Sequence, residues 1–385
     1  MRFLDAGESH GKALVGIIEG LPSGLRIDEK FINDELDRRR AGYGRGGRMK
    51  IESDRAEILS GVRDALTLGS PLAFVIENAD FSNWKGIMGE GACPDKALRA
   101  VTAVRPGHAD YAGSVKYGFT DARNVLERAS ARETAARVAA GAVAKLLLKE
   151  LGIEVGSHVY AIGGVKCSKG QYSADKLIGY ADQSPVRCMN AKAAKEMMKA
   201  IDEAKAAGDT LGGEVEVVIS GVPAGIGSYV HYDRKLDYAL MGAIGSVQSV
   251  KAVEIGLGAD YAEYPGSEVH DEMYLDCGRI KRKTNNAGGI EGGVSNGEDI
   301  IIRAALKPIP TVMRGLNTVD IATGECVRSE PERSDVCAVP AGGVVLEAVA
   351  AFVIADKILE TLGGDRMDEI VERMAKKRES EWKLR

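Results

Sequence analysis

"SARETAARVAAGAVAKLLLKE", residues 130–150, predicts a helix with too little polar surface to lie at the edge of a protein. Its apolar side chains recur at Ala135, Val138, Ala142 and Leu146, the spacing of one helix face. The pattern Ser-x-x-Glu at its start is a capping-box signature, so we expect the helix to open at Ser130. Small apolar residues continue around much of its girth, which predicts a helix buried in the interior.

Other helices are expected on both sides of this one. "PAGGVVLEAVAAFVIADKILETLGG", residues 340–364, predicts a second buried helix that starts after a proline and stops at a Gly-Gly pair. "DEKFINDELDRRR", residues 28–40, predicts a helix capped by Asp28, and a charged helix is expected at 365–380. Short alternating strands and glycine turns lie between these segments. The pattern predicts β-sheets packed on a buried helical layer.

One strand-and-turn pattern occurs twice. Residues 12–21 predict a strand that ends in the turn "EGLPSGL", and residues 214–226, "EVEVVISGVPAGI", repeat that plan. The shared turn pattern is G-[LV]-P-[SA]-G-[LI]. Two interpretations stay open at this point: chance recurrence of Gly-Pro-Gly turns, or an ancient duplication that relates residues of about 1–180 to residues of about 185–385.

Composition excludes several classes of function. The 385 residues carry a formal net charge of −5 and only 5% aromatic residues, which argues against general binding to nucleic acid or acidic membranes. The six cysteines form no C-x-x-C pair or zinc pattern, so we expect reduced thiols and no metal. The N-terminus has no signal-like apolar region, and no apolar run looks long enough to span a bilayer. We therefore expect a cytoplasmic protein.

A glycine-broken basic cluster, "RRRAGYGRGGRMK", occupies residues 38–50. Its glycines match G-x-G-x-x-G, but a helix rather than a strand precedes them, so it is not a dinucleotide fingerprint. In an acidic chain such a cluster favours a small phosphorylated ligand over RNA, which stays the alternative. Arg128, Ser130 and Arg132 crowd the start of the long helix and predict a further anion site.

Two of the five histidines lie in glycine turns beside acids. His10 of "GESHG" follows Glu8, and His108 of "RPGHADY" precedes Asp110. Imidazole titrates near neutrality, which makes both candidates for proton transfer. The remaining three histidines do not lie in such a setting and are expected to be structural: His158, His231 and His270. Asp335 of "RSDVCAVP" precedes a buried helix, as a helix cap or a catalyst would.

Six motifs in this order together resemble the chorismate synthase family, from about residue 7 to residue 364: "GESHG", "RRRAGYGRGGRMKIESD", "RPGHADY", "ERASARETAARVAAGA", "NNAGGIEGG" and "RSDVCAVPAGGVVLEA". The resemblance implies a single α+β domain over residues 1–385, a β-α-β sandwich of two related halves with a buried helical layer between antiparallel sheets. It implies a homotetramer. It also implies a carbon–oxygen lyase acting on phosphates, which converts 5-enolpyruvylshikimate 3-phosphate to chorismate by 1,4-anti elimination and requires reduced FMN.

The resemblance also assigns roles to residues. His10 would tune the protonation of the flavin, His108 would protonate the departing phosphate or hold the substrate, and Asp335 would relay a proton near the flavin. Arginines would hold the anions of the substrate or the phosphate of NADPH as reductant: Arg39, Arg45, Arg48, Arg105 and Arg132. The flavin contacts implied are Arg128, Ala129, Ser130, Gln248, Ser249, Gly292, Lys307, Pro308, Ile309, Pro310, Thr311 and Arg333.

The chain departs from the family's pattern at two positions near its motifs. Asp5 stands where threonine is frequent, and Ala129 stands where serine often occurs, so a flavin contact there must use the backbone. Two rival functions remain, both without turnover: a protein that binds a phosphorylated ligand, and an RNA-binding protein that uses the 38–50 arginines. An appended reductase domain is not recognisable, which favours an outside reductant.

Overall fold

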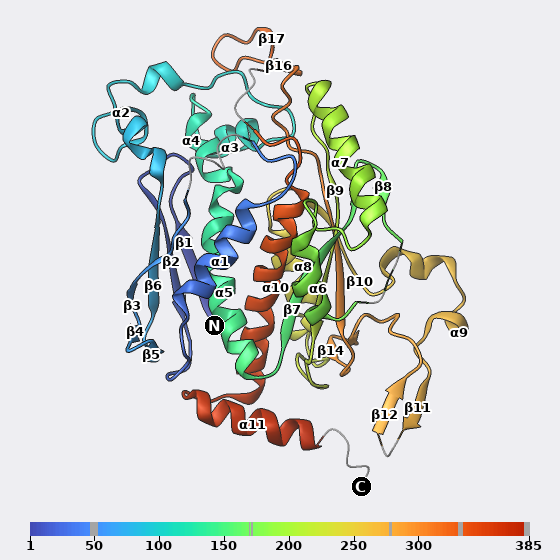
Figure 1. Ribbon diagram of the computed structural model, residues 1–385. Helices are drawn as coiled ribbons and strands as arrows, with labels where there is room; N and C mark the ends of the chain where they lie inside the picture. Colours follow the sequence, from blue (N-terminus) through green and yellow to red (C-terminus); the bar gives the residue numbers. More distant parts are fainter. Residues whose placement is uncertain (47–52, 169, 171, 277–278, 330–333, 381–385) are drawn as a thin grey trace.

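The structure is a computed structural model that describes residues 1–385 except 47–52, 169, 171, 277–278, 330–333 and 381–385. It combines helices with several antiparallel sheets (Figure 1). The first sheet has the order β1-β2-β6-β3, with β1 (Arg2–Ala6), β2 (Ala13–Glu19), β6 (Leu72–Glu77) and β3 (Glu57–Ser60). The second has the order β10-β15-β9-β7-β8, with β10 (Val250–Ile255), β15 (Ile300–Leu306), β9 (Gly213–Ser220), β7 (Glu154–Ile162) and β8 (Val165–Lys166).

Smaller elements complete the chain. Four two-stranded hairpins are formed by β4 (Val62–Arg63) with β5 (Leu66–Thr67), β11 (Met273–Asp276) with β12 (Arg279–Arg282), β13 (Ile290–Glu291) with β14 (Val294–Ser295), and β16 (Asn317–Val319) with β17 (Cys326–Arg328). The α-helices are α1 (Glu29–Arg40), α2 (Lys85–Met88), α3 (Asp110–Tyr117), α4 (Arg123–Ala129), α5 (Thr134–Glu150), α6 (Ala174–Tyr180), α7 (Ala191–Ala206), α8 (Leu236–Gly245), α9 (Gly266–Val269), α10 (Val339–Leu362) and α11 (Met367–Ser380).

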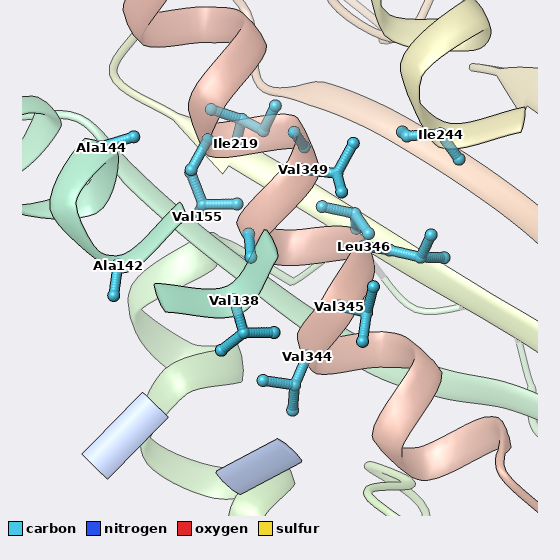
Figure 2. Packing of buried hydrophobic residues seen from close by; sticks show 14 of the residues in the cluster. Val138, Ala142, Ala144, Val155, Ile219, Ile244, Val344, Val345, Leu346 and Val349 are labelled. Atoms are coloured by element: carbon cyan, nitrogen blue, oxygen red, sulfur yellow. The ribbon is translucent and has the colours of Figure 1, made fainter. Parts of the chain in front are cut away.

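The two long apolar helices, α5 and α10, run side by side through the interior (Figure 1). α5 also packs on β2 of the first sheet, and α10 packs on β7 and β9 of the second. Figure 2 shows Val138 of α5 near Val344 and Val345 of α10, within one continuous cluster of buried side chains. The prediction of two buried helices beside β-sheets is confirmed.

The helix boundaries agree with those predicted from the sequence, except at the start of α5. Asp28 caps α1, and its carboxylate accepts a hydrogen bond from Phe31 N (3.1 Å). Gly363 ends α10 as predicted. The prediction of a capping box at Ser130 is wrong, because a 3-10 turn, η4 (Ala131–Glu133), precedes α5. Ser130 accepts from Arg132 N, and the Glu133 carboxylate binds Arg137 instead of reaching back.

The repeated turn adopts one hydrogen-bond pattern in both places. In the first copy the Thr67 hydroxyl donates to Pro22 O (2.6 Å) and accepts from Leu25 N (2.9 Å). In the second the Ser295 hydroxyl donates to Pro223 O (2.6 Å) and accepts from Ile226 N (2.8 Å). The paired turn glycines have matching left-handed φ values: 88° and 83° at positions 20 and 24, and 86° and 89° at positions 221 and 225. The motif is therefore one structural unit used twice, while duplication of the whole halves stays a prediction.

One helix of the described chain, α10, meets the length and apolarity needed to cross a membrane. The expectation that no apolar run reaches this length is therefore wrong. However, 83% of its most apolar window is buried inside the protein, as expected of a core helix.

The contact between α5 and α10 is close enough to require glycine. A Cβ at Gly141 would lie 2.5 Å from the backbone Cα of Ala348, inside van der Waals contact. We expect Gly141→Ala to lower the free energy of unfolding by about 1–3 kcal/mol, because the helices must separate. Gly179→Ala in α6 is the matched control, since its Cβ would meet nothing within 4 Å. Urea denaturation of both variants measures the difference, and equal stabilities would contradict close packing at Gly141.

Candidate active site

A cavity of about 380 Å³ opens where the first residues of α5 and α10 meet several loops. Its wall combines apolar side chains with many cations, and Asp335 is the one acidic residue among the described lining residues. The cationic and imidazole side chains in the wall are His10, Arg39, Arg45, Arg105, His108, Arg132 and Lys307. Such a wall suits a ligand that carries several negative charges.

His10 follows β1 and is fixed by a buried carboxylate from α4. Its Nδ1 lies 2.9 Å from Glu127 Oε2, and its backbone N donates to the same oxygen at 2.8 Å. Trp84 stacks on the imidazole with ring centroids 3.9 Å apart. Because Nδ1 faces Glu127, Nε2 is the nitrogen left to act on a ligand. The acid that His10 contacts is therefore Glu127, not Glu8, the acid beside it in the sequence.

The Glu127 carboxyl keeps its charge despite burial. Burial raises its pKa, but hydrogen bonds from His10 and Arg123 outweigh burial and leave the pKa below its usual value. A carboxylate that stays ionised holds the imidazole that it faces in one orientation. Glu127 was not singled out from the sequence, although it belongs to the motif "ERASARET".

His108 is fixed in a similar way by Asp110, as the sequence predicted. Its Nδ1 lies 2.5 Å from Asp110 Oδ1 in the first turn of α3. Arg105 donates from Nε to Asp110 Oδ2 at 2.8 Å and from Nη1 to Thr311 at 2.9 Å. Burial raises the pKa of Asp110, but His108 and Arg105 outweigh it and hold the pKa well below its usual range.

Asp335 is not a helix cap. α10 begins after Ala338, and no side chain caps it. Asp335 instead accepts from Arg45 Nη1 and from Gly46 N, both at 2.6 Å. A Cβ at Gly46 would lie 2.7 Å from Ser334 O, so only glycine allows the two loops to meet here. Asp335 thereby fastens the arginine segment to the start of α10.

Arg39 and Arg132 share a single carboxylate. Arg39 Nη1 lies 3.4 Å from Asp54 Oδ2, and Arg132 Nη1 contacts Asp54 Oδ1. Burial lowers the pKa of Arg39 to about 9, with Asp54 opposing and Arg45 and Arg132 adding to the decrease. Among the described lining residues, cationic side chains outnumber the one acidic side chain, Asp335.

The crowding of arginines at the start of α5 has an internal explanation. Arg128 donates to Asp5 Oδ2 (3.1 Å) and Gly7 O (3.1 Å), outside the cavity wall, and Arg132 turns towards Asp54. Burial and Glu133 raise the pKa of Asp5, which Arg128 opposes. Crowding alone therefore does not require a bound anion.

Most predicted flavin contacts line the same cavity. These are Ala129, Ser130, Gln248, Ser249, Lys307, Ile309, Pro310 and Thr311. Pro308 lies within this last segment but not in the wall, and Gly292 lies between β13 and β14, away from the wall. Arg48 and Arg333 fall outside the described residues. The roles of all these residues stay predictions.

One buried polar atom fits a flat heterocycle. Gln248 Nε2 donates to Glu133 Oε2 at 2.9 Å, whereas its buried Oε1 has no hydrogen-bond partner among the described residues. A buried acceptor without a donor is costly, so a ligand N–H is its natural partner. Leu126, Val247 and Val345 offer apolar surface in the same wall. These features fit the ring system of a flavin.

The fold and this cavity, with two oriented imidazoles among cationic side chains, suit an enzyme that acts on a small molecule. A family model described as chorismate synthase matches residues 1–359. The chain belongs to the chorismate synthase family. It is therefore a lyase of aromatic amino acid biosynthesis with a small-molecule substrate, and the family implies a requirement for reduced flavin.

Individual relatives agree along the whole chain. Chorismate synthase 1 of Bacillus cereus strain ATCC 14579 is 54% identical over 385 residues, covering 98% of this chain and 99% of that protein. Chorismate synthase of Geobacillus kaustophilus is 53% identical and covers 98% of each chain. A crystal structure of chorismate synthase superposes with a TM-score of 0.80 at 39% identity, covering 99% of this chain and 98% of the other.

The Asp110 pair yields a pH-dependent prediction. The pKa of Asp110 is lower in the folded chain than in the unfolded chain, where it is about 3.9. The carboxylate therefore stabilises the fold fully above a pH of about 3.9, and this stabilisation is lost as the pH falls through the pKa of the folded chain. We expect Asp110→Asn to lower the free energy of unfolding by about 2–4 kcal/mol at pH 7. The difference from the unsubstituted chain should shrink below a pH of about 4.

Urea denaturation at several pH values checks this expectation. Asp233→Asn is the matched control, because Asp233 binds His231 (2.7 Å) in an exposed pair. That change should have no measurable effect. A pH-independent loss in Asp110→Asn would show that the carboxylate charge is not what stabilises the turn.

Proposed function

We propose that this cavity catalyses the 1,4-anti elimination of phosphate from 5-enolpyruvylshikimate 3-phosphate to give chorismate. The carrying observation is the wall of the cavity, in which arginine, lysine and histidine side chains outnumber the one acidic side chain among the described lining residues, Asp335. A substrate with one phosphate and two carboxylates would complete the charge balance. Arg45 and Arg105 lie in the same wall and would orient those anions.

His108 is the proposed acid for the leaving group. Its Nδ1 is engaged by Asp110, so Nε2 would donate a proton to the departing phosphate oxygen. Arg105, held by the same carboxylate, would stabilise the charge that grows on that oxygen. Both groups are fixed before the substrate binds, which removes a cost of reorganisation from the reaction.

His10, Asp335 and Gln248 would serve the cofactor. When bound, reduced FMN supplies transient electron density and accepts the hydrogen lost from C6, which ordinary side-chain bases cannot remove. His10 would present Nε2 to the cofactor, because its Nδ1 is engaged by Glu127. Asp335 would hold and return a proton at its carboxylate, and Gln248 Oε1 would accept from a ring N–H. The segment 307–311 would contribute backbone contacts, and the proposed reductant is external NADPH.

The arginines of the basic cluster form ion pairs within the protein, which argues against RNA binding. Arg38, Arg39, Arg40 and Arg45 each form an ion pair with a carboxylate of the same chain. An RNA-binding face needs cations directed to solvent. We therefore place the protein in the cytoplasm as a biosynthetic enzyme without a nucleic-acid or membrane partner.

A homotetramer of two-part subunits completes the proposal. The outer face of the first sheet exposes Leu4, Val15 and Ile17, and the strand register places Leu4 opposite Ile17. A contiguous apolar sheet face of this kind favours contact with another subunit. The matching turns at Thr67 and Ser295 support a sandwich of two related halves around the helical layer.

An anaerobic product assay tests the function. We expect the purified chain, given chemically reduced FMN and 5-enolpyruvylshikimate 3-phosphate, to release inorganic phosphate and chorismate in equal amounts. Parallel reactions with oxidised FMN, with and without NADPH, show whether the chain reduces its own flavin. A binding protein would retain the substrate unchanged, and an RNA-binding protein would show RNA affinity that falls steeply with salt. Either result would overturn the proposal.

His108→Ala separates binding from chemistry. We expect it to bind FMN as the unsubstituted chain does, but to lose about 10²–10⁴-fold in kcat because the proton donor is gone. His231→Ala, in an exposed His-Asp pair, is the matched control and should keep full activity. Rates in His108→Ala equal to those of the unsubstituted chain would show that its role is misassigned.

A further inference from the structure

Two buried thiols that the mechanism does not use lie together at the edge of β7. Cys167 N donates to Tyr160 O (2.9 Å), and Val159 N donates to the carbonyl of Arg187 (2.9 Å), the residue before Cys188. These bonds attach Cys167 and the residue before Cys188 to two adjacent residues of β7, Tyr160 and Val159. The side chains of the two cysteines share a hydrogen bond.

An imidazole and a carboxylate accompany the two thiols. His158 is buried on β7, and its Nε2 lies 3.2 Å from Glu216 Oε1. The hydrogen bond from Cys167 lowers the pKa of Cys188, which burial opposes and His158 supports. The same bond and burial raise the pKa of Cys167. Because the thiolate is the reactive form of cysteine, Cys188 is the first nucleophile of the pair.

The pair lies just beneath the surface. Cys167 and Cys188 are only 5% and 4% exposed, but Lys166 and Ser168 on either side of Cys167 are exposed. A low-molecular-weight disulfide would reach the pair along this exposed edge. The same burial protects the thiols from general oxidation.

We propose that Cys167 and Cys188 are a reversible disulfide site whose oxidation slows turnover at the cavity. The oxidant is a low-molecular-weight disulfide. The Cys188 thiolate attacks one of its sulfurs, forms a mixed disulfide and releases one small thiol. The Cys167 thiolate then attacks the Cys188 sulfur and releases the second small thiol. Two protein thiols are oxidised, one small disulfide is reduced, and the two thiol protons end on the released thiols.

A short segment connects the pair to the cavity. Pro185 O accepts from Tyr43 N at 2.7 Å, and Tyr43 lies two residues before Arg45 in the wall. Arg187 has a left-handed backbone (φ 56°), and its Nη2 donates to Glu347 Oε1 at 2.7 Å. A non-glycine residue in this conformation is strained and persists because surrounding bonds hold it.

We expect formation of the disulfide to strain this segment. Bonded sulfurs lie about 2.05 Å apart, closer than two hydrogen-bonded thiols, so the two side chains must approach each other and pull on the strained backbone at Arg187. Movement at 185–188 would displace Tyr43 and with it the arginine segment. Because a shift of about 1 Å in a positioning group can cost about 100-fold in rate, we expect oxidation to reduce turnover at least about tenfold.

Peptide mapping of the full chain tests the site directly. The protein is incubated with oxidised glutathione, free thiols are alkylated, and trypsin releases "CSK" (167–169) and "CMNAK" (188–192). We expect these two peptides to appear linked, turnover to fall in parallel, and dithiothreitol to reverse both. Glutathione on Cys326 with free peptides at 167 and 188 would overturn the proposal, as would a linked pair with unchanged turnover.

Substitutions supply the control. Cys188→Ser should abolish the linked peptide and make turnover insensitive to oxidised glutathione, whereas Cys326→Ser, at an exposed thiol, should behave as the unsubstituted chain does. The mapping on the unsubstituted chain remains decisive if Cys188→Ser folds poorly. The rate readout rests on the proposed function: a fully reduced chain without turnover would count against that function, while the linked peptides report on the thiols alone.

Discussion

Glu347, with no exposed surface, holds the centre of the protein together. It lies on α10 and binds a cation from each of three other segments: Arg38 of α1 (2.8 Å), Lys145 of α5 (2.7 Å) and Arg187 (2.7 Å). Burial raises its pKa, but the three cations outweigh burial and keep the carboxyl ionised. Removing one partner of such a buried cluster costs about 3–5 kcal/mol, because the remaining charges stay buried without compensation. The cluster therefore fixes how the three helices lie relative to one another.

That fixed arrangement sets the geometry of the cavity. α1 ends at Arg40 and leads into the segment that carries Arg45; α5 starts at Thr134, after Arg132; α10 starts at Val339, after Asp335. The ends of these helices meet at one place because the ion cluster holds the helix bodies together. Short bonds then connect the ends, as Arg45 does with Asp335. Precision at the site thus depends on rigid helices rather than on the loops alone.

Local sequence patterns predicted the structural features that depend on residues close together in the chain. The buried helices, the cap at Asp28, the stop at Gly363 and the pairing of His108 with Asp110 follow from spacing within a few residues. Pairings across the fold could not be found this way. His10 binds Glu127 from a distant helix rather than the adjacent Glu8, and His158 also has an acidic partner. His231, which we expected to be structural, has a local acidic partner in Asp233. Which acid faces an imidazole is decided by packing.

The division of charge at the cavity explains how its wall can fold stably and why we propose a polyanionic ligand for it. Asp110 and Glu127 compensate the groups they orient, so these parts of the wall are stable by themselves. Asp54 instead contacts both Arg39 and Arg132, and the pKa of Arg39 falls to about 9 as a result of burial and cationic neighbours. A phosphate or carboxylate bound beside Arg39 would counteract this decrease in its pKa, and the free energy gained would contribute to binding.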